Sequence, residues 1–399
     1  MRGIGLFAAG LLATACWATA TRAADPGVSK TEIKIGNTMP YSGPVSSYSP
    51  IGKLDAAFFK MVNDQGGVAG HKINFISYDD GYSPPKTVEQ VRRLVEEDHV
   101  DFLFNTLGTP TNSAIVRYVN QKKVPHLFVA TGAAKWGDYK LYPWTTGLQP
   151  DYRTEAQIYM KYMLKEKPNA KLAILYQNDD FGKDYLSGVK TVLGSARYAK
   201  VTMASYEPTD ATIDSQITSL QASGADTLLV VAAPKFAAQS IRKVHDLNWH
   251  PMFFMTNVSI SVATVMKPAG QQNGIGIIST GYLKDPTDHQ WDNDPGMQEW
   301  RGFMAKNMPG ADMTDANYVY AYAASKLMLQ VLKQCNGDFS RANVMKQAEN
   351  VHDVVLPTVL PGILANTSTT DHRPLKGMRL EKWDGKTWVL FGDIIEAGS

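Results

Sequence analysis

The chain has 399 residues, which exceeds the usual size of one hydrophobic core and predicts two domains. Hydrophobic residues make up 44% and charged residues 20% of it, a globular composition that excludes a long disordered tail. The 40 basic and 38 acidic residues nearly balance, which argues against a partner such as nucleic acid or an anionic membrane surface.

The first 23 residues have the pattern of a secretory signal peptide. Arg2 gives a basic start, residues 4–15 are small and apolar, and residues 21–23 (TRA) place small side chains where signal peptidase cuts. The apolar run is shorter than the ~20 residues of a membrane-spanning helix. A lipoprotein signal ending at Cys16 is the alternative. We therefore expect a periplasmic mature chain.

Strands and helices then alternate in a first group. Gly, Pro and Asp residues separate the apolar runs, and the helical segments carry apolar residues on one face. We expect strands at 33–37, 71–78, 101–104 and 124–129, and helices at 51–65, 84–97 and 112–121.

A second group repeats this order. We expect strands at 171–176, 201–206, 226–231 and 251–255, and helices after residue 182, at 215–222 and at 236–247. The two groups share local sequence: residues 77–79 (SYD) match 205–207 (SYE), and 124–128 (VPHLF) resemble 250–254 (HPMFF). Such strand–helix alternation predicts βαβ units and a parallel sheet in each group.

The remaining segment completes both groups. It contains a strand at 276–282, helices at 316–333 and 341–348, and a hairpin of strands 380–383 and 388–391 that turns at Asp384-Gly385. The predicted fold class is α/β, with two doubly wound lobes. Lobe 1 is expected to comprise residues 28–147 and about 283–353, and lobe 2 about 148–282 and 354–396.

The loops that follow the strands are the candidate binding site, because open parallel sheets bind ligands beyond the carboxyl ends of their strands. Glycines let a ligand approach the backbone, threonines offer hydroxyls, and the free N–H groups at helix starts favour a carboxylate. Aromatic side chains supply apolar walls. From these loops we select Tyr48, Thr106, Leu107, Gly108, Thr109, Ala130, Thr131, Gly132, Ala133, Phe181, Pro234, Asn257 and Val258.

The mature chain resembles the Leu/Ile/Val-binding branch of the periplasmic binding proteins, which serve ATP-driven importers. The resemblance lies in residues 33–36 (IKIG) with 42–44 (SGP), in 63–70 (NDQGGVAG), in 78–80 (YDD) with Pro85, and in 315–322 (DANYVYAY). It implies a type I fold whose lobes are joined by a three-strand hinge and close on a small solute. It also implies a monomer that delivers the solute to an ABC transporter permease in the inner membrane.

The resemblance further implies ligand contacts from Tyr48, Gly108, Thr109, Ala133, Ala134, Phe181, Pro234 and Val258. Amino-acid binders of the family hold the ligand's ammonium with a tyrosine and a carboxylate, near the positions where this chain has Pro234 and Val258. An unpaired buried charge costs several kcal/mol. We therefore expect an aromatic or aliphatic carboxylate, or a neutral amide-like solute, in place of a plain α-amino acid. Lys135 or Lys235 is a candidate partner for its acid group.

Two other classes of function compete with a solute-binding protein. An enzyme would need a catalytic motif, and the sequence has no G-x-S-x-G, H-E-x-x-H or C-x-x-C pattern. The acidic segment from Asp285 to Asp294 has no regular ligand spacing and indicates a solvated loop, so we expect no catalytic residue, metal or cofactor. A ligand-sensing domain that reports to a receptor is the alternative that fold alone leaves open.

Overall fold

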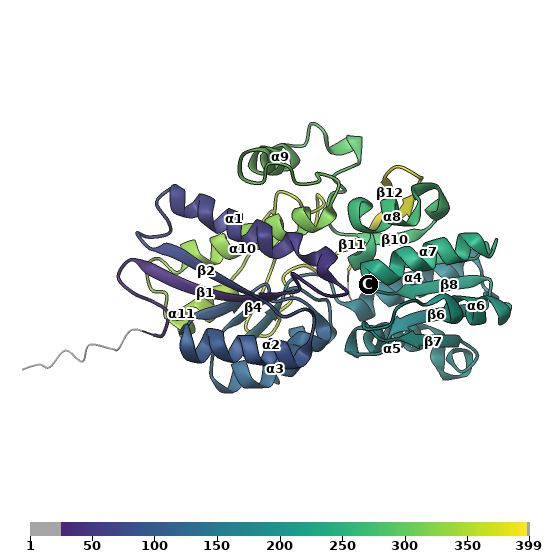
Figure 1. Cartoon of the computed structure of the whole chain (residues 1–399), viewed down its shortest axis with the longest axis horizontal. Coiled ribbons are helices and arrows are strands. Elements are labelled where there is room, and N and C mark those ends of the chain that lie inside the picture. The colour runs from purple at the N-terminus through teal and green to yellow at the C-terminus, as the bar shows by residue number, and fades with distance from the viewer. Residues whose placement is uncertain (1–24, 397–399) are drawn as a thin grey trace, which may run out of the picture.

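The computed structural model describes residues 25–396, which form two α/β lobes lying side by side (Figure 1). The predicted signal peptide at residues 1–23 lies outside the described residues. The predicted fold class is confirmed, since each lobe contains one sheet of mainly parallel strands covered by helices. Within residues 25–396, no helix has the length and apolar character needed to cross a membrane.

Lobe 1 is built on five parallel strands in the order β2-β1-β3-β4-β5. The strands are β1 (Glu32–Met39), β2 (Lys72–Asp79), β3 (Phe102–Phe104), β4 (His126–Val129) and β5 (Thr145–Gly147). The helices are α1 (Pro50–Asp64), α2 (Pro84–Arg92), α3 (Thr109–Gln121), α9 (Pro295–Asn307), α10 (Ala316–Gln334) and α11 (Arg341–Ala348). Helices α1 and α10 pack together on one face of this sheet, and α2 and α3 pack on the other (Figure 1).

Lobe 2 is built on seven strands in the order β12-β11-β10-β9-β8-β6-β7, of which β11 alone runs antiparallel to the others. The strands are β6 (Leu172–Gln177), β7 (Thr202–Tyr206), β8 (Thr227–Val231), β9 (Met252–Met255), β10 (Ile278–Gly281), β11 (Met378–Trp383) and β12 (Trp388–Ile395). The helices are α4 (Tyr152–Glu166), α5 (Asp180–Tyr198), α6 (Asp214–Ala222), α7 (Pro234–Asp246) and the short α8 (Lys267–Ala269).

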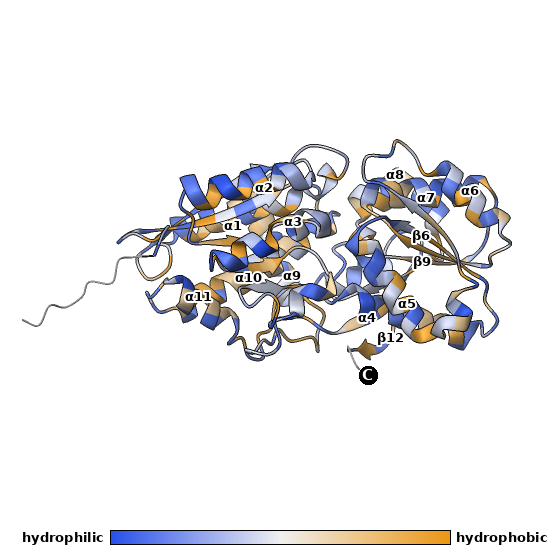
Figure 2. Ribbon diagram, turned by 90° about the horizontal axis from the view of Figure 1, so that it is seen from below, coloured by the Kyte–Doolittle hydropathy of each residue, from blue (hydrophilic) through white to orange (hydrophobic). Residues whose placement is uncertain are grey.

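Burial on both faces explains the uninterrupted apolar strands. In β8, Leu228 and Val230 pack in the core under α6 and α7, while Leu229 and Val231 join the core formed with α4. Successive side chains point to opposite faces, so a strand covered on both sides must be apolar at every position. Figure 2 shows the resulting three layers in lobe 2, with hydrophobic strands between helices whose outer faces are hydrophilic.

Besides the short α8, two helices were not predicted, and an aspartate precedes each of them. The Asp151 side chain accepts a hydrogen bond from Thr154 N at the start of α4, and Asp294 accepts one from Met297 N at the start of α9. Such residues satisfy the N–H groups that a helix leaves free at its start. The prediction of a solvated loop at Asp285–Asp294 was wrong for its two ends. Asp294 pairs with the buried Lys284 at 2.7 Å, and Asp285 accepts hydrogen bonds from the backbone N–H of Trp388 and the hydroxyl of Thr387.

The chain passes between the lobes at three places: from β5 to α4, after β10, and from α11 to β11. The second passage pairs with a later segment, because Leu283 forms an antiparallel bridge with Val359 and Leu360 N donates to Tyr282 O at 2.9 Å. The third passage lies beside the first, since Leu375 N donates to Leu148 O. The exact lobe boundaries and the hinge motion stay predictions.

Candidate ligand-binding site

A cavity lies between the lobes, where loops from the carboxyl ends of strands in both sheets meet. Its volume of about 100 Å³ suits a small organic molecule, since an apolar cavity of ~150 Å³ holds benzene. Lobe 1 contributes Tyr48, Ile51, Tyr82, Leu107, Gly108, Thr109, Ala130, Thr131, Ala316, Asn317 and Tyr320. Lobe 2 and the passages between the lobes contribute Gln149, Tyr152, Gln177, Phe181, Ala233, Asn257, Val258, Ile260, Ser261, Thr280, Gly281, Tyr282, Leu283, Lys284, Asp285, Glu381 and Trp388.

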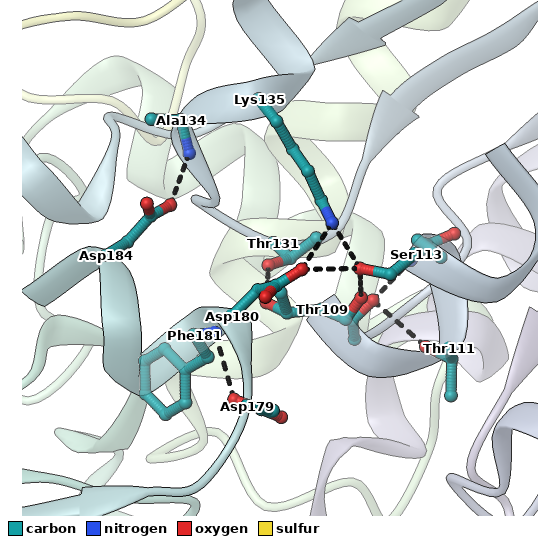
Figure 3. Close-up of polar contacts among 12 residues, drawn as sticks. Thr109, Thr111, Ser113, Thr131, Ala134, Lys135, Asp179, Asp180, Phe181 and Asp184 are labelled. Atoms are coloured by element: carbon teal, nitrogen blue, oxygen red, sulfur yellow. Dashed lines mark hydrogen bonds and ion pairs between the residues drawn. The ribbon is translucent and has the colours of Figure 1, made fainter. Parts of the chain in front are cut away.

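Two threonine hydroxyls form a polar site on the lobe 1 wall. Thr109 Oγ1 lies 2.5 Å from Thr131 Oγ1, and Thr131 Oγ1 lies 3.3 Å from the hydroxyl of Tyr152 (Figure 3 shows the two threonines). Thr109 is also the first residue of α3, whose N-terminus carries partial positive charge. Hydroxyl donors next to a helix start form a site that suits a carboxylate.

The turn before α3 requires glycine. Gly108 has a φ of 101°, and a Cβ atom there would lie 2.4 Å from the ring of Tyr82. The absence of a side chain at 108 lets Tyr82 pack against this turn. The Tyr82 hydroxyl accepts a hydrogen bond from Gln177 Nε2 of lobe 2 at 3.3 Å. Gly108 therefore positions an aromatic wall as well as the helix start.

Aromatic side chains form the rest of the wall. The Tyr152 and Phe181 rings pack with their centroids 4.8 Å apart, and Tyr48 reaches across to lobe 2, where its hydroxyl donates to Val258 O at 2.9 Å. Burial raises the pKa of Tyr48 and Tyr152 well above the usual range, so both hydroxyls stay neutral. Flat, largely apolar surfaces of this kind suit an aromatic or aliphatic body.

Most of the residues selected from the sequence meet on this cavity wall, although they come from five separate loops. These are Tyr48, Leu107, Gly108, Thr109, Ala130, Thr131, Phe181, Asn257 and Val258. Their meeting follows from the parallel sheets, which bring strand ends to one edge. That these side chains contact a solute stays a prediction.

Four selected residues lie behind the wall. Thr106 is fully buried, with its hydroxyl 2.6 Å from both Asn112 Oδ1 and His126 Nε2. Gly132 and Ala133 continue the Thr131 loop toward α4, where a Cβ on Gly132 would lie 2.7 Å from Pro150 O. Pro234 is the buried first residue of α7, and its neighbour Ala233 faces the cavity instead.

The two lysines suggested as partners for an acid group have other partners. Lys135 pairs with Asp180 at 2.7 Å, and Lys235 Nζ donates to Asp210 O at 2.9 Å. Neither lysine lines the cavity among the described residues. A solute carboxylate would therefore meet hydroxyl and N–H donors and no lysine ammonium.

Sequence reasoning missed the residues that reach the cavity from the passages between the lobes and from the last strands. Tyr152 follows the Asp151 cap of an unpredicted helix, and Asp151 with Thr154 was the signal that would have found it. Glu381 is a buried acid in the predicted hairpin strand, but Arg379 and Lys382 are charged there too, so its charge alone did not mark it as a cavity residue. Residues 280–285 carried no local signal, because their position depends on the path between the lobes.

Contacts at the mouth of the cavity join the two lobes (Figure 3). Lys135 of lobe 1 pairs with Asp180 of α5, and the backbone N–H of Ala134 donates to Asp184 Oδ2 at 2.7 Å. The hydrogen bond from Lys135 lowers the pKa of Asp180, so its carboxylate stays ionised. We call these two contacts the interlobe latch. The latch therefore joins the two lobes directly in this structure.

Removing the latch is expected to weaken solute binding. The latch contacts form only when the lobes are together, so their loss destabilises the arrangement that binds the solute. Asp184→Ala should lower affinity about tenfold, since it removes a largely buried charge-assisted hydrogen bond. Lys135→Met should lower it only about twofold, because the Asp180 side chain is half exposed and such pairs contribute little.

Titration calorimetry of these variants and of Lys183→Met tests the latch. Lys183 is an exposed lysine on the same helix and does not belong to the latch, so its replacement should leave the affinity unchanged. Unchanged affinity in the Asp184→Ala variant would mean that the latch does not stabilise the liganded form.

Within residues 25–396, no group of three or more histidine, cysteine, aspartate or glutamate side chains is placed to hold a metal ion. The sequence profile described as periplasmic binding protein matches residues 32–387. The Leu/Ile/Val-binding protein homolog 7 of Brucella suis is 22% identical over 383 residues, which cover 91% of this chain and 92% of the relative.

Solved structures support the same fold. A branched chain amino acid ABC transporter protein from Thermus thermophilus with bound valine superposes with a TM-score of 0.82 at 14% identity, covering 93% of this chain and 98% of the other. A fatty acid ABC transporter substrate-binding protein from Thermomonospora curvata gives 0.80 at 20% identity, covering 94% and 95%.

Proposed function

The chain belongs to the periplasmic binding protein family, and from that premise we propose that it is the solute-binding component of an ABC importer. In this role the mature protein is periplasmic, binds a small solute between its lobes, and delivers it to a permease in the inner membrane. The relatives named for Leu/Ile/Val binding support the branched-chain amino acid branch of these importers. The observation that carries the proposal is a cavity between two lobes that the interlobe latch joins.

The solute class follows from the two kinds of wall. We propose a small acid whose carboxylate binds Thr109, Thr131 and the start of α3, and whose aromatic or aliphatic body packs between Tyr152 and Phe181. Hydrogen bonds to a charged group are the stronger kind, so the two hydroxyls give the acid its orientation.

An ammonium group beside that carboxylate would meet no acid from Pro234 or Val258, and Asn257 Oδ1, a free acceptor on the cavity wall, is uncharged. Val258 offers an apolar side chain, and its carbonyl already accepts from Tyr48. Pro234, which the resemblance implied as a ligand contact, lies behind the wall and supplies no acid there. The two solved neighbours are named for valine and for a fatty acid, so this fold is compatible with acids that have or lack an amino group.

Two experiments test the proposal. Small-angle X-ray scattering of the purified mature chain should give a smaller radius of gyration at saturating acid than in its absence, because lobe closure is a hinge motion. Deletion of the gene should abolish uptake of the same acid by intact cells, and the chain should co-purify with a permease. Normal uptake in the deletion strain would contradict the importer role.

A further inference from the structure

Glu381 lines the cavity without a partner. Its side chain belongs to β11, is 2% exposed, and is included in the cavity wall. Its Oε1 atom is buried and has no hydrogen-bond partner among the described residues. Buried polar groups are nearly always hydrogen-bonded, and an unpaired buried carboxylate is costly. The folded chain therefore leaves Glu381 Oε1 without a hydrogen bond or an ion pair.

The backbone next to Glu381 leaves room for its carboxylate. Gly281, also on the cavity wall, lies on the neighbouring strand β10, and a Cβ atom there would lie 2.5 Å from Glu381 Oε2. Any other residue at 281 would displace the carboxylate. The site is thus formed by a glycine on one strand and an acid on the next, at the end of the cavity where the chain passes between the lobes.

The surroundings of Glu381 are acidic. Asp285, on the same wall, accepts hydrogen bonds from Thr287, Thr387 and Trp388, and Glu155 of α4 accepts from Tyr159 and from the N–H of Asn257. Burial nevertheless outweighs these hydrogen bonds, so it raises the pKa of Asp285 and raises that of Glu155 to about 7.

The nearby lysine is already occupied. Lys284 is on the cavity wall, and its Nζ pairs with Asp294 at 2.7 Å and donates to Pro357 O at 2.8 Å. The described residues thus provide no free ammonium or guanidinium for Glu381 on this wall. The region therefore favours a positive charge that arrives with the solute.

We propose that Glu381 binds a cationic nitrogen of the solute, so that the transported molecule is an acid with an amino group separated from its carboxylate. This inference rests on the proposed function and specifies a second polar group of the solute, an ammonium, in addition to its carboxylate. The carboxylate binds at Thr109 and Thr131 on lobe 1, and the ammonium pairs with Glu381 on lobe 2. A solute held at both ends links the lobes and favours their closure.

Pairing also explains how the empty cavity tolerates this acid. Burial, with smaller contributions from Asp285, Glu155 and Asp288, raises the pKa of Glu381 well above its usual range. The empty protein thus holds Glu381 protonated, and an arriving ammonium stabilises the ionised form. In the competing explanation, Glu381 stays neutral and only donates a hydrogen bond to the solute. A glutamine at this position would donate the same hydrogen bond, so Glu381→Gln would bind the solute as the wild type does.

Matched pairs of acids distinguish the two accounts. The probes are 4-aminobutanoate, 5-aminopentanoate and 4-(aminomethyl)benzoate, each measured against the acid in which a methyl group replaces the ammonium: pentanoate, hexanoate and 4-ethylbenzoate. For the wild type, at least one aminated acid should bind about tenfold or more tightly than its methyl counterpart. In the Glu381→Gln variant this preference should disappear, while the methyl acids bind within about twofold of wild type.

Asp288→Asn is the matched control, because it removes one nearby acid that does not line the cavity and should keep the preference. If the wild type binds the methyl acids but never prefers an aminated one, this inference is overturned and the proposed function stands. A preference that survives in Glu381→Gln also overturns it. If no acid of either kind binds, the proposed function fails together with it. Should Glu381→Gln not fold, the wild-type pairs decide alone.

Discussion

Replacing Thr109 and Thr131 together by valine is expected to weaken the binding of carboxylate solutes about 100-fold. The two hydroxyls lie 2.5 Å apart on the cavity wall, so one donates to the other and the second keeps a hydrogen for the solute. Valine has nearly the shape of threonine and removes both donors. Since hydrogen bonds to a charged group contribute about 1.5–3 kcal/mol each, loss of this site dominates the affinity.

The double variant is the informative one. A single replacement leaves one buried hydroxyl without its partner, whereas replacing both partners by apolar groups of the same shape is nearly neutral for stability. Its melting temperature without solute should therefore stay close to wild type. Thr111→Val is the control, because Thr111 lies in the first turn of α3, donates a hydrogen bond to Leu107 O, and does not line the cavity.

The measurement is a calorimetric titration with an acid and with the corresponding amide. The double variant should lose affinity for the acid and change little toward the amide, since the missing donors favour a charged acceptor. An equal loss for acid and amide would mean that the threonines shape the cavity without selecting a carboxylate. Unchanged affinity for the acid would show that Thr109 and Thr131 do not bind its carboxylate.

Replacing Asp55 by asparagine is expected to change how stability depends on pH. Asp55 of α1 is fully buried in lobe 1, where it accepts hydrogen bonds from Asn105 Nδ2 and Ser325 Oγ at 2.8 Å each. Burial raises the pKa of Asp55 to about 7, and these two hydrogen bonds lower it by less. The folded chain therefore keeps a proton on this carboxyl at pH values where the unfolded chain has released it.

The sign follows from that difference. Below pH ~4 both states are protonated and Asp55 has no effect on the free energy of unfolding. As pH rises from ~4 to ~7, the unfolded chain releases the proton, and stability falls by up to about 1.4 kcal/mol per pH unit, or about 4 kcal/mol in total. Asparagine resembles the protonated acid and cannot ionise, so Asp55→Asn should be more stable than wild type near neutral pH and similar to it at pH 4.

Urea unfolding at pH 4, 5.5 and 7 measures this difference. The same series on Asp64→Asn is the control, since Asp64 lies exposed at the end of the same helix with its pKa lowered by the hydrogen bond from Lys60. That variant should retain the downward slope of the wild type. Identical slopes for Asp55→Asn and wild type would show that Asp55 does not stay protonated in the folded chain.

The architecture of both lobes was predictable because the signals were local. Apolar runs bounded by glycine and proline gave the strands, and α11 and α10 begin at the predicted residues 341 and 316. The candidate loops followed from the repeat, since parallel sheets place strand ends together. The start of α3 was predicted three residues late, because Thr109 and Pro110 were read as loop although proline is common in the first turn of a helix.

The part of the cavity around Glu381 and Asp285 was less predictable, because it depends on contacts between distant segments. Glu381 meets Gly281 across strands 100 residues apart, and Asp285 is held by Thr387 and Trp388 of the final hairpin. No periodicity encodes which strand lies beside β10. A buried acid in a strand indicates that it has some polar partner. Only the strand order, which places Glu381 at the cavity, indicates that this partner is a solute.

A melting-temperature screen of the mature chain tests most directly whether an acid binds between the lobes. The solutes are short aliphatic, benzoate-like and cinnamate-like acids, amino acids with terminal amino groups, leucine, valine and the amides of the acids. We expect some acids to raise the melting temperature in proportion to the logarithm of their concentration and more strongly than their amides do, while leucine and valine leave it unchanged. Strong stabilisation by leucine or valine, or equal stabilisation by acids and their amides, would contradict this expectation.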